Sequence, residues 1–327
     1  MQQRELGRTG EKVSAIGLGC MGMVGWYGER DDAEARASID RALELGITHF
    51  DTAAVYQNGD NERFVGESIR GRRGRVFLAT KCGMARGPDG RVAVDCRPST
   101  IARSCDESLA RLQSGHIDLF YLHRVDRDVP IEESMQAMAA LVTAGKIRHV
   151  GLSEASPATL RRAHAVHPVA ALQSELSLST QSASRPALQA CAELGISFVA
   201  YSPLGRGFLT GAITDLADLP ATDTRRVFPR FSADKLPENL EMSRRVQSLA
   251  DQCGCSPAQL ALAWVLAQGD NVLPIPGTKK RRFLEDNAGA ADIVLSAAQL
   301  QDIARELPEA LVHGERYPDS MLGALNA

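Results

Sequence analysis

The strongest constraint on the fold is a pattern that recurs along the chain, in which a helical stretch ends in glycine and a short apolar segment follows. The segments after Gly46 (ITHFD) and Gly195 (ISFVA) are the clearest copies, and looser copies follow Gly74, Gly115, Gly145 and Gly269. Glycine just past a helix takes the left-handed conformation that closes it. Short apolar runs rich in Ile, Val, Leu and Phe are typical of parallel strands buried on both faces.

Helical stretches separate these apolar segments, at residues 31–45, 99–112, 131–142, 156–166, 185–193, 256–267 and 280–290. With further strands at 15–18 and 169–172, strands are predicted near residues 16, 47, 76, 118, 148, 170, 197 and 272. Eight strands alternating with helices predict a closed (β/α)8 TIM barrel of the α/β class. Residues 4–14 predict an N-terminal β-hairpin, and the wide interval before the last strand predicts a long loop at 205–237 and extra helices near the C-terminus. No low-complexity linker divides the chain, so residues 1–327 are expected to form a single domain.

Composition narrows the choice of partners and compartment. The 327 residues carry a formal net charge of -3, which argues against nucleic acid or an anionic membrane as the main partner. No apolar run approaches the roughly 20 residues of a membrane span, and the N-terminus has no signal-peptide pattern. The 7 scattered cysteines are expected to be reduced thiols of a cytoplasmic protein. Cys253 and Cys255 lack the spacing of a zinc site, so we interpret them as packing residues.

Residues 17–22 (GLGCMG) match the dinucleotide-binding pattern GxGxxG and follow a predicted strand. In a Rossmann fold that pattern opens a helix whose N-terminus holds the pyrophosphate. Here the residues MVGWYG come next, and the helix is not expected before Asp31. We therefore interpret the motif as a glycine-rich loop that closes the first strand.

Four polar residues follow three consecutive predicted strands: Asp51 and Tyr56, then Lys81, then His123. Because barrel active sites lie at the C-terminal ends of the strands, these side chains are expected to share one mouth. A tyrosine is a poor proton donor at neutral pH, a nearby ammonium lowers its pKa, and a carboxylate holds that ammonium in place. A neutral histidine beside the phenol would bind the carbonyl oxygen on which charge grows as hydride arrives. The joint placement predicts carbonyl reduction with Tyr56 as general acid, although each residue alone is also typical of a strand end, a cap or a structural histidine.

Residues 46–53 (GITHFDTA), with Tyr56 after them, resemble the signature of the aldo-keto reductases. The segments ATK at 79–81, GLS at 151–153, YSPLG at 201–205 and IPGT at 275–278 are similar to the same family, in order, and the resemblance runs from the hairpin to about Asn287. It implies that the catalytic tetrad falls on Asp51, Tyr56, Lys81 and His123. It also implies an extended NADPH across the barrel mouth without a Rossmann domain. The loop lengths resemble the branch that contains pyridoxal reductases and potassium-channel β subunits.

The resemblance further implies which residues contact the cofactor. Ser153 and Gln173 correspond to residues that bind the nicotinamide carboxamide, and Tyr201 corresponds to the aromatic residue that stacks on the ring. The rest of the implied set is Met21 and Asp51, then Ser202, Pro203, Leu204, Gly205 and Arg206 along the pyrophosphate, and Gly277, Thr278, Lys279, Asp286 and Asn287 at the adenosine end.

The residues themselves add a reason to expect the phosphorylated cofactor. Residues 278–282 form a predicted helix N-terminus that carries four basic side chains. Helix N-termini favour anions and disfavour cations, so a basic cluster there indicates a bound anion such as the 2′-phosphate of NADPH. The alternative is an exposed, solvated basic turn.

Two positions depart from the family pattern. Glu154 stands where many members have asparagine beside the carboxamide, although the pair Ser153-Glu154 occurs in one branch, so cofactor binding is expected to survive. Phe283 stands where the better-studied reductases place an arginine on the 2′-phosphate, and the neighbouring lysines and arginines are expected to replace it.

Substrate contacts are expected from the loop after the first strand, at Met23, Trp26 and Tyr27, and from Tyr56, His123 and Arg124. Trp26 and Tyr27 either form a pocket wall or pack as part of a lid. Arg124 either attracts a carboxylate or phosphate of the substrate or pairs at the surface with Asp126 or Asp128.

Three functional classes follow from these residues. The favoured one is an NADPH-dependent reductase of small aldehydes or ketones. A nicotinamide-sensing module with vestigial activity is the alternative, but the channel β subunits carry asparagine at the position of His123, so the histidine favours a working reductase. A metal-dependent hydrolase is disfavoured because the first strand offers only Cys20 as a ligand, and no metal site is predicted.

Overall fold

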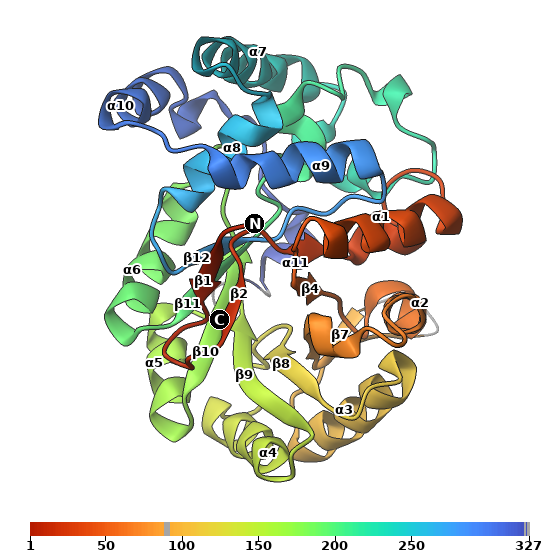
Figure 1. Cartoon of the computed structure of the whole chain (residues 1–327). Helices are drawn as coiled ribbons and strands as arrows, with labels where there is room; N and C mark the ends of the chain where they lie inside the picture. The colour runs from red at the N-terminus through yellow and green to blue at the C-terminus, as the bar shows by residue number, and fades with distance from the viewer. Residues whose placement is uncertain (88–91, 324, 326–327) are drawn as a thin grey trace.

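The computed structural model describes residues 1–87, 92–323 and 325, and its centre is a ring of parallel strands (Figure 1). In hydrogen-bonded order these are β3 (Leu18–Gly19), β4 (His49–Asp51), β5 (Phe77–Cys82), β8 (Ile117–Leu122), β9 (Ile147–Ser153), β10 (Val169–Glu175), β11 (Ser197–Tyr201) and β12 (Val272–Pro274). The (β/α)8 fold and the positions of its strands are therefore as the sequence predicts.

Helices surround this ring, and α7 and α10 lie outside it at the top of Figure 1. The helices that the sequence predicts are α1 (Asp32–Glu44), α3 (Pro98–Leu112), α4 (Ile131–Thr143), α5 (Pro157–Val166), α6 (Arg185–Leu194), α8 (Pro257–Leu266) and α9 (Arg281–Gly289). The elements that the helix and strand predictions did not specify are α2 (Asp60–Ser68), α7 (Leu236–Cys253), α10 (Ala297–Glu306), α11 (Asp319–Leu322) and the hairpin of β6 (Met84–Arg86) and β7 (Val92–Val94). The first helix begins as predicted, because the Asp31 side chain accepts a hydrogen bond from the Glu34 amide.

The glycines of the GLGCMG motif close the barrel. The amides of Gly17 and Gly19 donate to the carbonyl oxygens of Pro274 and Pro276, at 2.9 and 3.1 Å, which joins β3 to β12 and the residues after it. A Cβ at Gly19 would lie 2.7 Å from the Ile275 carbonyl oxygen, so only glycine permits this approach. A short 3-10 helix at Met21–Val24 follows, and α1 begins only at Asp32. The motif is the glycine-rich loop that we expected and not a Rossmann fingerprint.

The predicted N-terminal hairpin, β1 (Gln3–Glu5) and β2 (Lys12–Ser14), crosses the centre of the ring in Figure 1. Leu6 and Val13, both fully buried, pack against inward-facing strand residues such as Phe77 and Leu119. The hairpin thus covers the N-terminal end of the barrel.

The long segment after β11 is more ordered than a loop prediction suggests. It contains 3-10 turns at Gly205–Thr210, Leu216–Asp218, Thr224–Val227 and Pro229–Phe231 before α7 begins. The buried side chains of Phe208 and Phe231 anchor it to the body of the protein.

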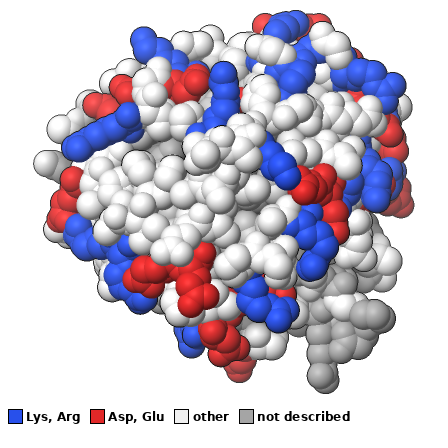
Figure 2. Space-filling view, turned by 90° about the horizontal axis from the view of Figure 1, so that it is seen from below, with Lys and Arg blue, Asp and Glu red and all other residues white. Residues whose placement is uncertain are grey.

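The surface in Figure 2 carries side chains of both charges, interspersed around the rim of a largely uncharged centre. No broad basic area is visible on this face, which agrees with the slightly negative net charge. Within the described ranges, no helix combines the length and apolarity that crossing a bilayer requires.

His49 makes the stability of the fold depend on pH. Its ring is fully buried, neither ring nitrogen has a hydrogen-bond partner among the described residues, and burial lowers its pKa to about 4. A histidine in the unfolded chain titrates near pH 6.5, so the unfolded state takes up a proton first as the pH falls. We expect the free energy of unfolding to fall by about 3 kcal/mol between pH 6.5 and pH 4 on account of His49 alone.

Urea unfolding at several pH values measures this contribution. His49→Leu is expected to flatten the acid side of the stability profile with little loss at pH 7, because an apolar group of similar size replaces an unpartnered polar ring. His167→Leu, at the surface after α5, is the matched control. An unchanged acid slope in His49→Leu would contradict the assignment.

Candidate active site

The buried ammonium of Lys81 is the centre of the site. It contacts the Asp51 carboxylate, donates to the carbonyl oxygen of Thr52 at 2.8 Å and lies 3.4 Å from the Tyr56 hydroxyl. The Gln173 amide donates to the second oxygen of Asp51 at 2.8 Å, so both oxygens of the carboxylate are engaged. The ends of β4, β5 and β10 therefore bring these groups together.

His123 completes this cluster at the end of β8. Its ring lies edge-on to that of Tyr56, with centroids 5.8 Å apart, and no described residue bonds to its buried Nδ1. Burial lowers the pKa of His123 well below its ordinary value, and the nearby charges of Arg124 and Lys81 lower it further. The imidazole is therefore neutral at physiological pH and suited to hydrogen-bond a carbonyl oxygen rather than to act as a cation.

The pKa of Tyr56 is shifted in the direction opposite to the one that the sequence predicts. Burial raises the pKa of its phenol, and the Lys81 ammonium only partly offsets that effect, so the pKa lies above its ordinary value. Desolvation of the buried phenol therefore outweighs the effect of the ammonium, which alone would lower the pKa. The consequence is that the phenol keeps its proton at neutral pH, as a proton donor requires.

A cavity of about 1220 Å³ opens beside this cluster. It runs from Tyr56, His123 and Tyr201 to the start of α9. The predicted cofactor and substrate residues that line it are Met21, Trp26, Tyr27, Asp51, Tyr56, His123, Arg124, Ser153, Gln173, Tyr201, Ser202, Pro203, Leu204, Arg206, Gly277, Thr278, Lys279, Asp286 and Asn287. Lys81 lies behind Asp51 and Tyr56, and neither it nor Gly205 is among the lining residues.

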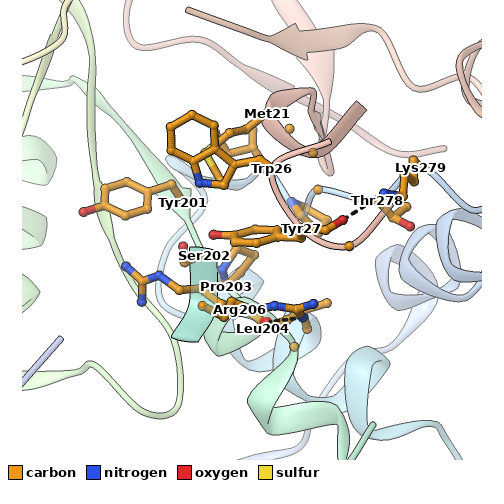
Figure 3. A pocket seen from close by; sticks show the side chains of 18 of the residues that line it. Met21, Trp26, Tyr27, Tyr201, Ser202, Pro203, Leu204, Arg206, Thr278 and Lys279 are labelled. Atoms are coloured by element: carbon orange, nitrogen blue, oxygen red, sulfur yellow. Dashed lines mark hydrogen bonds between the residues drawn. The ribbon is translucent and has the colours of Figure 1, made fainter. Parts of the chain in front are cut away.

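The loop after β3 crosses the middle of this cavity. Figure 3 shows Tyr27 between the Tyr201–Pro203 segment and the Thr278–Lys279 segment. The Lys279 ammonium donates to the carbonyl oxygens of Tyr27, at 2.8 Å, and of Glu29. From the other side, the Gly28 amide donates to the Asp223 carboxylate at 2.8 Å. Lys279 was expected at a phosphate, but in this structure its ammonium holds the loop.

The three substrate candidates in this loop have different environments. Trp26 lines the cavity with its ring centroid 6.1 Å from that of Tyr56, which agrees with a pocket wall. Tyr27 also lines the cavity, and the Arg225 guanidinium lies over its ring at 5.0 Å. Met23 is fully buried in the hydrophobic core, so its prediction as a substrate residue is wrong.

Glu154, which departs from the family pattern, is the centre of a buried polar network. Its carboxylate pairs with Arg316 at 3.1 Å and accepts hydrogen bonds from Ser174 at 2.8 Å and from the Tyr201 hydroxyl at 2.9 Å. Tyr317 in turn bonds to the Tyr201 hydroxyl at 3.0 Å. Burial acts to raise the pKa of Glu154, but Arg316 and Arg124 outweigh it and leave the pKa lowered. No local sequence pattern indicates this role of Arg316, which lies 162 positions from Glu154 along the chain.

A second buried carboxylate attaches the long segment to the strand ends. Glu175, at the end of β10, pairs with Arg206 at 3.2 Å. The Arg206 guanidinium also lies 4.4 Å from the ring centroid of Phe228. The predicted pyrophosphate residue Arg206 is therefore held at the cavity wall by a buried ion pair.

Among the described residues no group of three or more His, Cys, Asp or Glu side chains is arranged to hold a metal ion.

The parallel barrel, with a buried lysine, a carboxylate, a tyrosine and a neutral histidine at its strand ends, defines an enzyme of the barrel oxidoreductase class. The chain belongs to the aldo/keto reductase family, whose model matches residues 15–306.

Two relatives support this assignment along nearly the whole chain. An aldo-keto reductase of Schizosaccharomyces pombe, whose name specifies NADP(+), is 43% identical over 314 residues, or 94% of this chain and 92% of that protein. Probable aldo-keto reductase 1 of Glycine max is 43% identical over 97% of this chain and 92% of its own length.

Solved structures agree with the fold. The glycerol dehydrogenase of Gluconobacter oxydans superposes with a TM-score of 0.84 at 30% identity, covering 94% of this chain and 96% of that one. An aldo-keto reductase from Bacillus halodurans in its holo form superposes with a TM-score of 0.76 at 29% identity, and the match covers 97% of this chain and 99% of that one.

The Glu154 network is expected to contribute to stability. Glu154→Gln would leave the buried Arg316 without its counter-charge, and removing one partner of a buried ion pair typically costs about 3 kcal/mol. We expect a lower midpoint of urea unfolding and faster proteolysis of the C-terminal segment. Glu133→Gln, on the exposed side of α4, is the matched control and should change stability by less than about 0.5 kcal/mol. Equal stability of the two variants would contradict the role of the network.

Proposed function

We propose that this protein reduces aldehydes or ketones to alcohols with NADPH. The observation that carries the proposal is the contact of Tyr56 with the buried Lys81–Asp51 pair beside a neutral His123, at one end of a long cavity. A protonated phenol and a neutral imidazole that face the same space are the groups that carbonyl reduction requires.

The cavity has the residues to hold a nicotinamide dinucleotide. Ser153 and Gln173 offer polar groups for a carboxamide, and the half-buried Tyr201 offers an aromatic face beside them. Ser202, Pro203, Leu204 and Arg206 line the cavity between Tyr201 and Thr278 (Figure 3), and Asp286 and Asn287 line it from α9, as a dinucleotide in extended form would need. When bound, the reduced nicotinamide supplies a hydride to the carbonyl carbon. The NADP(+) in the name of the Schizosaccharomyces pombe relative supports this choice of cofactor.

The side chains of this chain then have distinct roles. Tyr56 donates its hydroxyl proton to the carbonyl oxygen, and the nearby ammonium of Lys81 stabilises the phenolate that remains. Asp51, fixed by Gln173, keeps Lys81 charged in a buried position. Neutral His123 donates a hydrogen bond to the same oxygen and positions it.

Three of the four basic residues at the start of α9 have other contacts. Lys279 bonds to the loop after β3, Arg281 pairs with Glu34 at 3.0 Å, and the Arg282 guanidinium lies 4.5 Å from the ring centroid of Phe283 and does not line the cavity. Lys280 lines the cavity and has no carboxylate within 4 Å among the described residues. We therefore assign Lys280, with the Thr278 hydroxyl, to the 2′-phosphate.

Tyr56→Phe tests the catalytic assignment. The variant should lose at least about a hundredfold in kcat, because general acid catalysis typically contributes that much, while fluorescence titration should give an unchanged Kd for NADPH. Tyr317→Phe removes a phenolic hydroxyl from the same cavity, one that does not contact Lys81, and its kcat should fall by less than about tenfold.

Retained turnover in Tyr56→Phe, or loss of NADPH binding, would contradict the role of Tyr56. In the wild type, a slow single turnover with the cofactor retained would favour the nicotinamide-sensing module instead.

Lys280→Ala tests the phosphate assignment. Loss of one charge-assisted contact should raise the Kd for NADPH by about tenfold and leave the Kd for NADH within about twofold. Lys12→Ala, on the hairpin at the opposite end of the barrel, is the control. A parallel change in both dissociation constants would mean that Lys280 supports the fold of the cavity and does not contact the 2′-phosphate.

A further inference from the structure

Arg124 is a buried cation next to the reacting groups. It directly follows His123, only 8% of its surface is exposed, and it lines the cavity that Tyr56 and Trp26 also line. Its Nη1 donates to the His123 carbonyl oxygen at 2.6 Å and to the Ser153 hydroxyl at 3.2 Å. These two bonds fix the guanidinium against the cavity wall.

The surface ion pair that the sequence offered as an explanation of Arg124 does not form. The oxygens of Asp126 accept from the amides of Cys96, at 2.9 Å, and of Asp128, at 3.0 Å. No carboxylate of the described residues lies within 4 Å of the Arg124 guanidinium nitrogens, and its Nε and Nη2 donate no hydrogen bond within this part of the chain. Arg124 is thus a buried guanidinium whose Nε and Nη2 donors have no acceptor among the described residues.

The surrounding charges leave Arg124 without a carboxylate of its own. The buried carboxylate that bears on it is Glu154, which Arg316 already pairs at 3.1 Å. At this end of the cavity Arg124 and Arg316 therefore share one carboxylate. A buried cation without a full counter-charge is costly to the folded state and is typical of a site that receives an anion.

We propose that Arg124 binds a carboxylate of the substrate, so that the preferred substrates are aldehydes or ketones that carry a carboxylate at the end remote from the reacting carbonyl. The inference rests on the proposed function, because it takes the carbonyl oxygen to lie at Tyr56 and His123. A guanidinium with Nε and Nη2 free presents the planar pair of donors that a carboxylate accepts. A substrate held by its carbonyl at His123 has Arg124, the next residue, in the same wall.

Matched aldehydes test the proposal in the full-length protein. With NADPH, kcat/KM is measured for 4-carboxybenzaldehyde and for 4-methylbenzaldehyde, which differ mainly in the carboxylate. We expect the wild type to prefer the carboxylated aldehyde by at least about tenfold. Arg124→Met should bring the ratio close to one, and Arg124→Lys should keep part of the preference through its charge. Arg127→Met, an exposed arginine of the same loop, should behave as the wild type.

A binding measurement separates substrate recognition from a structural role. Calorimetry with the alcohol product 4-(hydroxymethyl)benzoate, in the presence of NADP+, should show at least tenfold weaker binding to Arg124→Met, while the Kd for NADPH stays the same. A parallel loss of NADPH affinity would overturn the proposal, because Arg124 would then act through Ser153 on the cofactor.

The outcomes distinguish a failure of the proposed reductase function from a failure of the proposed role of Arg124. A wild-type protein that reduces neither aldehyde contradicts the proposed function itself. A wild type that reduces both equally, or an Arg124→Met variant that keeps the preference, contradicts only the role of Arg124. A preference for a phosphorylated aldehyde such as glyceraldehyde 3-phosphate over the carboxylated one would replace the carboxylate by a phosphate and overturn the stated substrate class.

Discussion

The burial of the Lys81 ammonium against Asp51 is the interaction on which the rest of the site depends. A buried ammonium is stable only with a counter-charge and acceptors in place, and here Asp51 and the Thr52 carbonyl supply them. That arrangement requires β4 and β5 to pair in one register, with Asp51 opposite Ala79, so that Lys81 follows two residues later. The barrel thus fixes the position of the charge, which lies 3.4 Å from the hydroxyl of Tyr56, the proton donor in the proposed reaction.

The segments that cover the cavity are attached to the strand ends by buried ion pairs. Glu154 holds Arg316 near the C-terminus, and Glu175 holds Arg206 of the long segment after β11. Glu154 directly follows β9, and Glu175 ends the neighbouring strand β10. Segments that are far apart in sequence therefore meet at one wall of the cavity, which Arg206 and Tyr317 line.

The sequence predicted the barrel well because glycine-closed helices and apolar strands are local signals. The clustering of Asp51, Tyr56, Lys81 and His123 was also predictable, because these residues lie at or shortly after the ends of three parallel strands, and parallel strands in a barrel end at one mouth. The Glu154–Arg316 pair and the engagement of Lys279 by backbone carbonyls depend on contacts between distant segments, which no local pattern encodes. The raised pKa of Tyr56 escaped prediction for a related reason, because desolvation depends on how closely the surrounding elements pack.

The proposed reaction transfers a hydrogen from the nicotinamide to the carbonyl carbon, and isotopic labelling follows that hydrogen. The protein is incubated with an aldehyde and NADPH that carries deuterium at both hydrogen positions of C4 of the nicotinamide, and the alcohol is examined by NMR and mass spectrometry. We expect one deuterium on the carbinol carbon of each product molecule, with the hydroxyl proton exchanging with water. An alcohol without deuterium, or consumption of NADPH without any alcohol, would contradict it.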